Sequence, residues 1–478
     1  MMETVASDYL VVGAGAMGMA FTDVLMAETG ATVTIVDRHA RPGGHWNDSY
    51  PFVRLHQPSS FYGVNSRKLG SDAKDLVGWN SGLYELASGT EVVSYFEQVM
   101  NQQFLPSGRV SYFPMSEYLG NGLIRGLTSG KETVIESRKT VDATYMNVTV
   151  PAVTPPSYEV MAEVRCIPPN ELPSVTDPPD GYVVVGGGKT AIDSCLWLLS
   201  NNVDPEAIRW VVPRDQWMLD RANIQPGPEF AERAILRQVE TMEIVASSTS
   251  LDQMFNQLLE RGVLLQLDAS VRPTMYRCCT VTRLELEELR RIRNIVRSGH
   301  VQRIGLTRID LDDETISTSP NTVHVDCTAD GLTRRPIRPI FEDDRLTLQT
   351  VRTCQQVFSA AFIAHVEATY EDDTIKNDVC TVVPHPDDTL DWVRTTMENA
   401  LNSIKWNADP GLKTWLSEAR LDGFSRLRGV AERTPEQDKL LGRIFEATPT
   451  ALENLATYLE EGRKSNCCQL SEDGSGWS

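Results

Sequence analysis

The sequence predicts an α/β protein with parallel sheets, because one strand–turn–helix–strand pattern occurs twice in its 478 residues. The first copy lies at residues 8–37 and the second at residues 181–214. In each copy an apolar run breaks at a glycine-rich turn, helical spacing follows, and a second apolar run closes the unit. A continuous apolar run is typical of a parallel strand that is covered on both faces.

The turn of the first copy has the glycine spacing of a Rossmann-like dinucleotide-binding fold, Gly13-x-Gly15-x-x-Gly18. Gly13 permits the tight turn, Gly15 lets the backbone approach a pyrophosphate, and Gly18 lets the helix pack closely on the strand. The second strand ends on Asp37. Its carboxylate can accept both hydroxyls of an adenosine ribose and would repel a 2′-phosphate.

The start of the helix after this turn is a predicted phosphate site, because its unpaired N–H groups and dipole favour an anion. Ala16 and Met17 lie there, and Arg38 follows the ribose-binding acid, so we expect all three to contact the cofactor. A glycine-rich turn without a ligand is the alternative. The two strands, the helix and the terminal acid together favour the cofactor.

The second copy carries Gly186-x-Gly188 followed by an alanine, and it lacks the terminal acid. Arg214 stands after its second strand instead, and a guanidinium suits the 2′-phosphate of NADP. An exposed loop charge is the alternative for Arg214. Lys189 and Thr190 lie within the turn and are candidates for pyrophosphate contacts, although Lys189 is equally well explained as a solvated side chain.

Charge and composition exclude several classes of partner. The formal net charge is −20 and the pI about 4.9, so the surface repels nucleic-acid phosphates and anionic lipid. No apolar stretch approaches the ~18 residues of a membrane span. The N-terminus has no basic segment of a signal peptide, which favours a cytoplasmic protein.

The spacing of the cysteines also favours a cytoplasmic protein. Nine cysteines are scattered along the chain, and no C-x-x-C occurs. This argues against a disulfide-reductase site and against a zinc ribbon, and no metal site is predicted. We expect structural or incidental thiols in a reducing cytosol.

With both motifs in place, the chain resembles two-dinucleotide-binding flavoproteins, and most of all the flavin-containing and Baeyer–Villiger monooxygenases (class B flavin monooxygenases). The most specific stretch is residues 41–60, RPGGHWNDSYPFVRLHQPSS. It is similar to the GG-x-W segment and the following loop beside FAD in those enzymes. The resemblance implies FAD at the first motif, NADPH at the second, and FAD contacts from Gly44, His45, Trp46, Arg54 and Gln57.

Some of these contacts have alternatives. An ordinary surface ion pair is the alternative for Arg54, and a plain core tryptophan is the alternative for Trp46. Arg221 is a further, weaker candidate for holding NADP.

The sequence departs from the family at two places. The family carries F-x-G-x-x-x-H before the second glycine motif, and the corresponding region here contains no histidine. Where the family has Asn or Asp near the oxygen-reacting face of the flavin, this sequence has His56. His56 is the candidate catalytic residue, because an imidazole titrates near neutral pH and can donate or exchange a proton. A structural histidine bonded to the backbone is the alternative.

Residues 141–144 and 325–331 are similar to the points where the chain crosses between the two domains of these enzymes. The resemblance implies a discontinuous FAD domain and an inserted NAD(P)H domain, at residues 1–150 with 325–400 and at residues 178–324. Asp330 would then lie near the ribityl chain of the flavin, and a plain loop aspartate is the alternative.

The remaining segments are read from their periodicity. Residues 282–297 have the spacing of one amphipathic helix, and from about residue 386 the sequence becomes helical, which predicts a C-terminal helical region over residues 386–462. The second region would cover the substrate cavity or form the face of a homo-oligomer. Residues 463–478 are polar and rich in glycine and serine, and we expect them to be disordered.

The activity implied by the resemblance is that of an NADPH-dependent monooxygenase. Hydride from NADPH would reduce FAD, and dioxygen would form a C4a-peroxyflavin that oxygenates a small organic substrate. A flavin oxidase or dehydrogenase is the second hypothesis, which the missing histidine signature keeps open. A non-enzymatic redox sensor that binds dinucleotides is the third.

Overall fold

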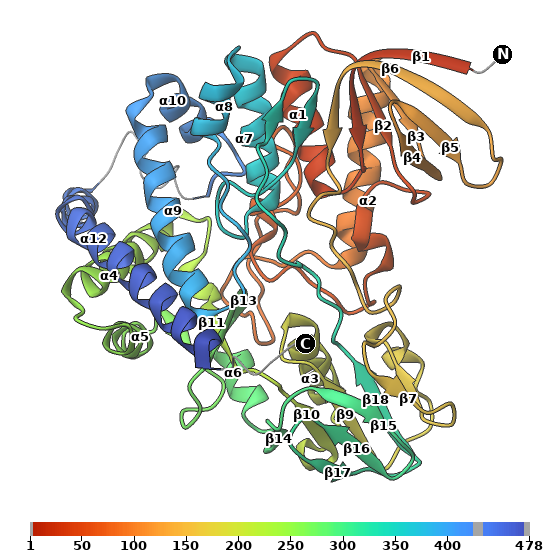
Figure 1. Cartoon of the computed structure of the whole chain (residues 1–478), viewed down its shortest axis with the longest axis vertical. Helices are drawn as coiled ribbons and strands as arrows, with labels where there is room; N and C mark the ends of the chain where they lie inside the picture. The colour runs from red at the N-terminus through yellow and green to blue at the C-terminus, as the bar shows by residue number, and fades with distance from the viewer. Residues whose placement is uncertain (1–2, 424–433, 473–478) are drawn as a thin grey trace.

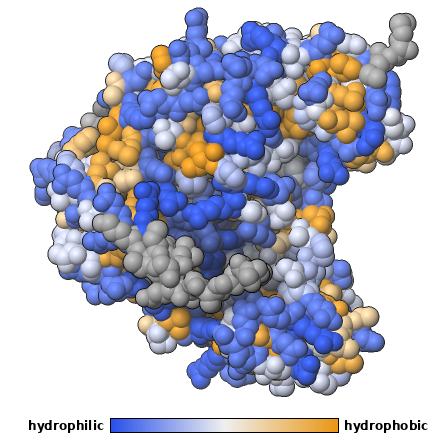
Figure 2. Space-filling view, in the orientation of Figure 1, coloured by the Kyte–Doolittle hydropathy of each residue, from blue (hydrophilic) through white to orange (hydrophobic). Residues whose placement is uncertain are grey.

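The computed structural model describes residues 3–423 and 434–472. Two parallel sheets, one in the upper part and one in the lower part of Figure 1, are joined by helices and loops on one side. The face in Figure 2 is mostly hydrophilic, with apolar side chains in separate patches. The predicted α/β class with two dinucleotide-type sheets is therefore confirmed.

The first unit is a sheet of order β19-β20-β6-β1-β2-β3, to which the hairpin β4–β5 is added. Strands β1, β2, β3, β6 and β20 pair in parallel. Its elements are β1 (Glu3–Val12), α1 (Ala16–Glu28), β2 (Val33–Val36), α2 (Gly89–Val99), β3 (Val110–Phe113), β4 (Ser116–Gly120), β5 (Leu123–Gly126), β6 (Glu132–Asp142), β19 (Phe341–Glu342), β20 (Arg345–Thr347) and α7 (Gln356–Thr369).

Helices α1 and α7 pack against each other and share one apolar core with the sheet. Both are almost entirely buried, which explains why they are apolar on all sides rather than on one stripe. Strands β19 and β20 come from a segment about two hundred residues after β6, so the first sheet is discontinuous in sequence. The predicted domain boundaries themselves stay a prediction.

The second unit is a parallel sheet of order β14-β10-β9-β18-β8. A small sheet of order β17-β16-β15-β7 packs on one face, and α3 and α6 pack on the other. The elements are β7 (Glu159–Val160), β8 (Cys166–Ile167), β9 (Gly181–Val185), α3 (Lys189–Ser200), β10 (Ile208–Val211), α6 (Arg283–Leu289), β14 (Asn294–Val296), β15 (Val301–Ile304), β16 (Arg308–Leu311), β17 (Thr315–Ser317) and β18 (Thr322–Asp326).

A third apolar core joins the sheet β12-β11-β13 to helices from the middle and the end of the chain. Here α12 packs on α4 and α9. The elements of this region, together with α8 and α10, are β11 (Gln216–Asp220), α4 (Ala231–Ser247), α5 (Leu251–Glu260), β12 (Leu264–Leu265), β13 (Met275–Val281), α8 (Asp373–Val379), α9 (Thr389–Ala408), α10 (Pro410–Glu418) and α12 (Pro435–Glu472).

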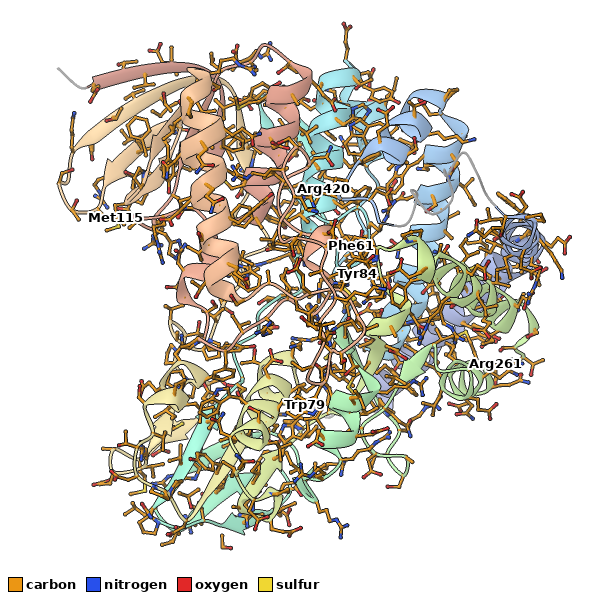
Figure 3. The ribbon with its side chains drawn as sticks, turned by 180° about the vertical axis from the view of Figure 1, so that it is seen from behind. Phe61, Trp79, Tyr84, Met115, Arg261 and Arg420 are labelled. Atoms are coloured by element: carbon orange, nitrogen blue, oxygen red, sulfur yellow. A yellow bond between two sulfur atoms is a disulfide. The ribbon has the colours of Figure 1, made fainter. Side chains whose placement is uncertain are left out.

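A long loop, residues 50–88, leaves the first unit and reaches the second. Phe61, Tyr84 and Trp79 mark its path in Figure 3. Near its upper part, Arg420 donates to the carbonyl oxygen of Tyr62 at 2.9 Å. Near its lower part, Trp79 packs on the core of the second unit and accepts a hydrogen bond from Thr282. The loop therefore lines the space between the two units.

Two predictions about local structure are wrong. Residues 282–297 do not form one helix, because α6 ends at Leu289 and Asn294–Val296 form β14. Pairing of β14 with β10 overrides the helical periodicity of that segment. Residues 463–472 continue α12, because elongation of an established helix is easier than starting a new one. Residues 473–478, also predicted to be disordered, lie outside the described residues.

Within the described residues, no helix has both the length and the apolar character that crossing a membrane requires.

We predict that Gly18→Ala destabilises the protein, because a Cβ at Gly18 would overlap the carbonyl oxygen of Gly13. The expected loss is about 1–3 kcal/mol of unfolding free energy, measured by urea denaturation. Gly30→Ala is the matched control, because a Cβ there meets nothing within 4 Å. Equal denaturation midpoints for the two variants would contradict the close packing of helix on strand.

Candidate functional site

One cavity of about 730 Å³ lies between the first unit, the long loop and the second unit. It falls in the upper part of the range of ~300–1,000 Å³ found for ligand pockets. The turn at Gly13 and Gly15 lines one part, and Lys189 and Asp193 at the start of α3 line another. The structure therefore brings elements of both glycine motifs to a single cavity.

The first glycine turn forms a cradle of backbone. Gly13 has φ +105°, which a residue with a side chain rarely adopts. A Cβ on Gly44 would stand 2.9 Å from the Cα of Gly15, so glycine is needed where these two turns meet. Helix α1 begins after Gly15 without a side-chain cap. Its first N–H groups, next to the cavity-lining residues Ala16 and Met17, are free to bind an anion.

Asp37 lies at the end of β2 and is largely used by the protein itself. Its Oδ2 accepts the N–H of Ala14 at 2.6 Å, and its Oδ1 accepts the backbone N–H and the ring Nδ1 of His39 at 2.7 and 2.9 Å. A carboxylate offers about four acceptor positions, so about one remains for a ligand. Asp37 can therefore accept about one ribose hydroxyl in this arrangement, whereas the sequence predicted that it accepts both.

His39 is a cavity residue that the motif did not reveal. Its ring bridges Asp37 and Asp48, and the hydrogen bond to Asp37 is the main cause that raises its pKa to about 9. A protonated imidazole therefore stands beside Asp37 and neutralises its charge at neutral pH. The only sequence signal was its position two residues after the acid. Arg38 also lines the cavity.

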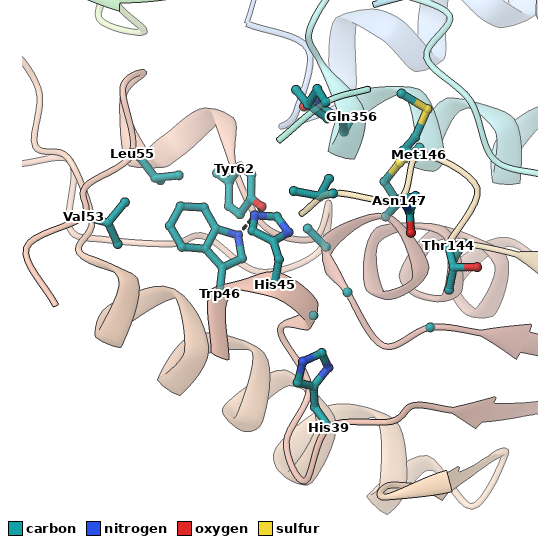
Figure 4. Close-up of a pocket in the computed structure, with 18 of the residues that line it drawn as sticks. His39, His45, Trp46, Val53, Leu55, Tyr62, Thr144, Met146, Asn147 and Gln356 are labelled. Atoms are coloured by element: carbon teal, nitrogen blue, oxygen red, sulfur yellow. Dashed lines mark hydrogen bonds between the residues drawn. The ribbon is translucent and has the colours of Figure 1, made fainter. Parts of the chain in front are cut away.

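The predicted Gly-Gly-x-Trp segment forms a wall of the cavity. Gly44–Asp48 are a short 3-10 helix, and the Trp46 indole donates to the Tyr62 hydroxyl at 2.7 Å. Figure 4 shows His45, Trp46 and Tyr62 grouped in this way, with His39 apart from them. Burial lowers the pKa of His45 to about 4, so this ring is neutral.

Two residues further along the loop also line the cavity, and their contact with FAD stays a prediction. Arg54 donates to the Leu86 carbonyl oxygen at 3.1 Å, and it forms no ion pair within the described part of the chain. Gln57 lies beside the same cavity.

His56 lines the cavity, and its Nδ1 is inaccessible and lacks a hydrogen-bond partner among the described residues. Burial, with smaller contributions from Lys189, Arg221 and His385, lowers its pKa to about 3. The expectation that His56 titrates near neutral pH is therefore wrong. It is a neutral imidazole that presents one N–H and one lone pair.

Arg221 does not hold NADP, because its guanidinium is 1% exposed and has no free donor. Its five N–H groups bond to the His56 carbonyl oxygen, to Asn80, to the Thr280 carbonyl oxygen and twice to Glu285, at 3.0–3.3 Å. Arg221 instead fastens the loop that carries His56.

Part of the second glycine motif serves the packing of the fold, and another part lines the cavity. Gly186 has φ +133°, and a Cβ there would stand 2.8 Å from the Cys327 carbonyl oxygen. Lys189 pairs with Asp193, which also accepts the Tyr50 hydroxyl at 2.7 Å, and all three line the cavity. The other residues predicted at this turn, Gly188 and Thr190, do not line it, and neither do Gly186 and Gly18.

Arg214 is engaged by a carboxylate, which sequence reasoning missed. Its guanidinium binds Asp387 at 3.0–3.2 Å, and Arg277 binds both Asp387 and Asp330. Burial tends to raise the pKa of Asp387, but hydrogen bonds from Arg214 and Arg277 outweigh it and hold the pKa below its ordinary value. A 2′-phosphate at Arg214 would have to compete with this carboxylate.

In this network only Arg277 reaches the cavity. Asp330 pairs with that guanidinium and does not itself line the cavity, so its place beside the flavin stays a prediction. Arg277 and Asp387 are 110 residues apart and belong to no motif, so no local signal marks their pairing.

A disulfide links Cys278 in β13 with Cys354 before α7, and both cysteines line the cavity. The expectation of thiols alone is therefore wrong for these two. The absence of C-x-x-C excludes only disulfides between cysteines that are close in sequence, whereas this pair is separated by 76 positions. Cys467 and Cys468 lie in the part of α12 whose side chains are not described.

The family model of the NAD(P)-binding Rossmann-like domain matches residues 11–58, which include the first glycine motif. A cyclohexanone-bound crystal structure of cyclohexanone monooxygenase is similar to this chain with TM-score 0.48 and 14% identity, over 78% of this chain and 87% of that one. A flavin-containing monooxygenase from Stenotrophomonas maltophilia is similar with TM-score 0.42 and 13% identity, over 80% and 100%. At these values no function is assigned from the likenesses.

Two mycobacterial proteins are much more similar in sequence. The uncharacterized protein Rv2000 of Mycobacterium tuberculosis is 52% identical over 459 residues, which are 96% of this chain and 85% of that protein. The uncharacterized protein Mb2023 of Mycobacterium bovis matches with the same values. The chain belongs to the family of these mycobacterial proteins.

Proposed function

We propose that this protein is an FAD-dependent oxidoreductase that is reduced by NADPH, and that it acts as a monooxygenase on a small organic substrate. The observation that carries the proposal is the single cavity that reaches from Asp37 at the first glycine motif to Lys189 at the second. Two dinucleotides bound at these motifs would meet in one cavity, as transfer of a hydride requires.

The residues at the first motif fit FAD. The uncapped start of α1 and the cradle at Gly13, Gly15 and Gly44 would hold the pyrophosphate, and a Cβ at Gly44 would fill that cradle. Asp37, oriented by His39, would accept one ribose hydroxyl. His45 and Trp46 would form the wall along the cofactor. When bound, FAD supplies a two-electron carrier that accepts a hydride and reacts with dioxygen.

The second motif would hold the nicotinamide dinucleotide. Lys189 at the start of α3 would place its ammonium beside the pyrophosphate. Asp193, which accepts the Tyr50 hydroxyl, pairs with that ammonium and orients it. Arg214 would take the 2′-phosphate by exchanging Asp387 for it. A guanidinium keeps its charge in both arrangements, so the exchange moves no proton.

His56 has the second role that we propose at this site. Its buried Nδ1 has no hydrogen-bond partner in the part of the chain that the structure describes, and such a group is normally satisfied by a ligand or by water. A neutral imidazole can donate one hydrogen bond to an oxygen atom of a reacting group without adding a charge. We therefore propose that His56 donates a hydrogen bond to an oxygen atom during the reaction of dioxygen with a small organic molecule.

The first test is a spectrum of the purified protein, followed by anaerobic mixing with NADPH or NADH. We expect the absorbance of oxidised flavin, its rapid loss on mixing, and a transient adduct spectrum after oxygen is admitted. A colourless protein that cannot be reconstituted with FAD would refute the flavin site. A flavin that neither nucleotide reduces would refute the nicotinamide site.

Arg214→Ala is expected to raise the KM for NADPH by about tenfold or more while changing the KM for NADH little. The reason is that a charge-assisted bond to the 2′-phosphate contributes about 1.5–3 kcal/mol. Steady-state kinetics with both coenzymes measures the difference. Arg308→Ala, which removes an exposed arginine paired with Asp310, is the control. Equal effects on the two coenzymes would disprove the assigned role.

His56→Ala is expected to increase the release of hydrogen peroxide per NADPH oxidised and to leave the rate of flavin reduction unchanged. The imidazole would act on the oxygen-dependent half of the reaction only. Stopped-flow reduction and a peroxide assay separate the two halves. If reduction itself collapses, His56 does not lie where the proposal places it.

Stability is expected to fall in acid because of His45, His56 and His385. Burial lowers their pKa values from 6.5 to about 4, 3 and 4. Between about pH 6.5 and 4 the unfolded chain binds protons that the folded chain does not, so the free energy of unfolding decreases as the pH falls. Urea denaturation across this range measures the slope, and His56→Gln should reduce it. A slope that the substitution leaves unchanged would contradict a neutral His56; His300→Gln, at an exposed histidine outside the cavity, is the control.

A further inference from the structure

The disulfide Cys278–Cys354 lies in the cavity that we assign to the cofactors, and nothing in the proposed monooxygenase reaction uses it. Cys278 belongs to β13, whereas Cys354 precedes α7, which packs on α1 beside the first glycine turn. The bond therefore ties β13 to the segment that leads into α7.

The remaining cysteines whose side chains are described behave differently. Cys166, Cys195, Cys279, Cys327 and Cys380 are free, and none of them lines the cavity. Burial raises the pKa of the Cys279 thiol to about 12 and that of Cys166 to about 11, so both are poor nucleophiles. Within the described structure, both cysteines exposed to the cavity are the paired ones.

The backbone at the disulfide is unusual. Cys278 has φ +56° and Cys354 has φ +58°, a left-handed conformation that residues with side chains seldom adopt. Residues held in such conformations cluster at active sites and switch regions. In this chain two of them are joined to each other inside the cavity.

Groups that handle protons and charge surround the two sulfur atoms. The Nε2 of His385 lies 3.7 Å from Cys354 Sγ, and the Tyr276 hydroxyl oxygen lies 3.7 Å from Cys278 Sγ. Burial, together with the charge of Arg277, lowers the pKa of His385 to about 4, so its ring is neutral and can donate or accept a hydrogen bond. Arg277, the neighbour of Cys278 in sequence, also lines the cavity, where it pairs with Asp330 and Asp387.

We propose that Cys278–Cys354 is a redox-active disulfide that accepts an electron pair from the reduced flavin. The inference rests on the proposed function, because NADPH is the source of the electrons. The S–S bond breaks, the sulfur atoms take up the electron pair and two protons, and two thiols form while the flavin returns to its oxidised state. The overall balance is NADPH, one proton and the disulfide giving NADP⁺ and two thiols.

The roles of the two sulfur atoms differ in this proposal. Cys278 is 4% exposed, whereas Cys354 is partly exposed and stands beside His385. Cys354 therefore leaves as the thiolate, and the neutral His385 ring beside it can donate a hydrogen bond to that sulfur atom. The two protons that complete the thiols come from the reduced flavin.

The test uses the full-length holoprotein under anaerobic conditions. The protein is treated with NADPH, quenched in denaturant with an alkylating reagent, and analysed by mass spectrometry. We expect Cys278 and Cys354 to be unlabelled before NADPH and labelled after it. Titration of the flavin spectrum should require twice as much NADPH in the wild type as in Cys278→Ser or Cys354→Ser, because the disulfide takes up a second electron pair. Cys166→Ser, at a free cysteine outside the cavity, is the control and should behave as the wild type.

The outcomes separate this inference from the proposed function. If the flavin is completely reduced while Cys278 and Cys354 stay joined, the redox-active disulfide is overturned. The proposed reduction of FAD by NADPH is then still supported. If NADPH does not reduce the flavin, reduction by light and EDTA supplies the electrons, and labelling of both cysteines then supports the disulfide alone. A chain that binds no flavin overturns both. Because the labelling is read on the wild type, a variant that fails to fold does not decide the result.

His385→Ala tests this hydrogen bond. We expect formation of the labelled thiols to slow by about tenfold or more, since a hydrogen bond to a charged group typically contributes a factor of about ten or more. The rate of the first loss of flavin absorbance should stay as in the wild type. A variant with unchanged thiol formation would show that His385 takes no part.

Discussion

The buried guanidinium of Arg221 is the interaction on which the arrangement of the site depends. A charge removed from water is tolerated only when it is paired and every donor is satisfied, and Arg221 meets this condition with bonds to four residues. Two of the four, His56 and Asn80, lie in the long loop, and Thr280 and Glu285 lie in β13 and α6. Removing one partner of such a buried pair typically costs about 3–5 kcal/mol. The geometry of the cavity is therefore fixed by one side chain that never enters it.

Local motifs could be predicted from the sequence, and contacts between distant segments could not. Gly13, Gly15 and Gly18 lie within six positions, and the backbone conformation that each requires follows from the turn itself. The pairing of Arg277 with Asp387 and of Cys278 with Cys354 depends on how the units dock, which no short pattern encodes. The same limit explains Arg214, whose position was predicted but whose carboxylate partner lies 173 residues away. It also explains β14, where pairing with a neighbouring strand decided the local structure against the periodicity.

The electrostatics of the cavity differ from those of the chain. The protein carries a formal charge of −20, yet the cavity is lined by more positive than negative side chains: Arg38, Arg54, Lys189, Arg277 and the protonated His39 against Asp37, Glu117 and Asp193. An excess of one sign in a cleft with low-dielectric walls favours ligands of the opposite charge. Burial keeps His45, His56 and His385 neutral, while Asp37 keeps His39 charged. The same residue type thus supplies neutral hydrogen-bonding groups in three positions and a fixed cation in a fourth.

The late return of β19 and β20 to the first sheet has a consequence for the order of events during synthesis. Strand β20 pairs with β6, and α7 packs on α1, so the first unit is incomplete until the chain has been made beyond residue 369. All strands of the second unit's parallel sheet have left the ribosome by then. Because domains generally fold as units during synthesis, the inserted unit can fold before the unit that precedes it in sequence. The edge of β6 that later pairs with β20 and the apolar surface of α1 then remain without these partners until α7 has been made, and during that interval they expose the nascent chain to aggregation.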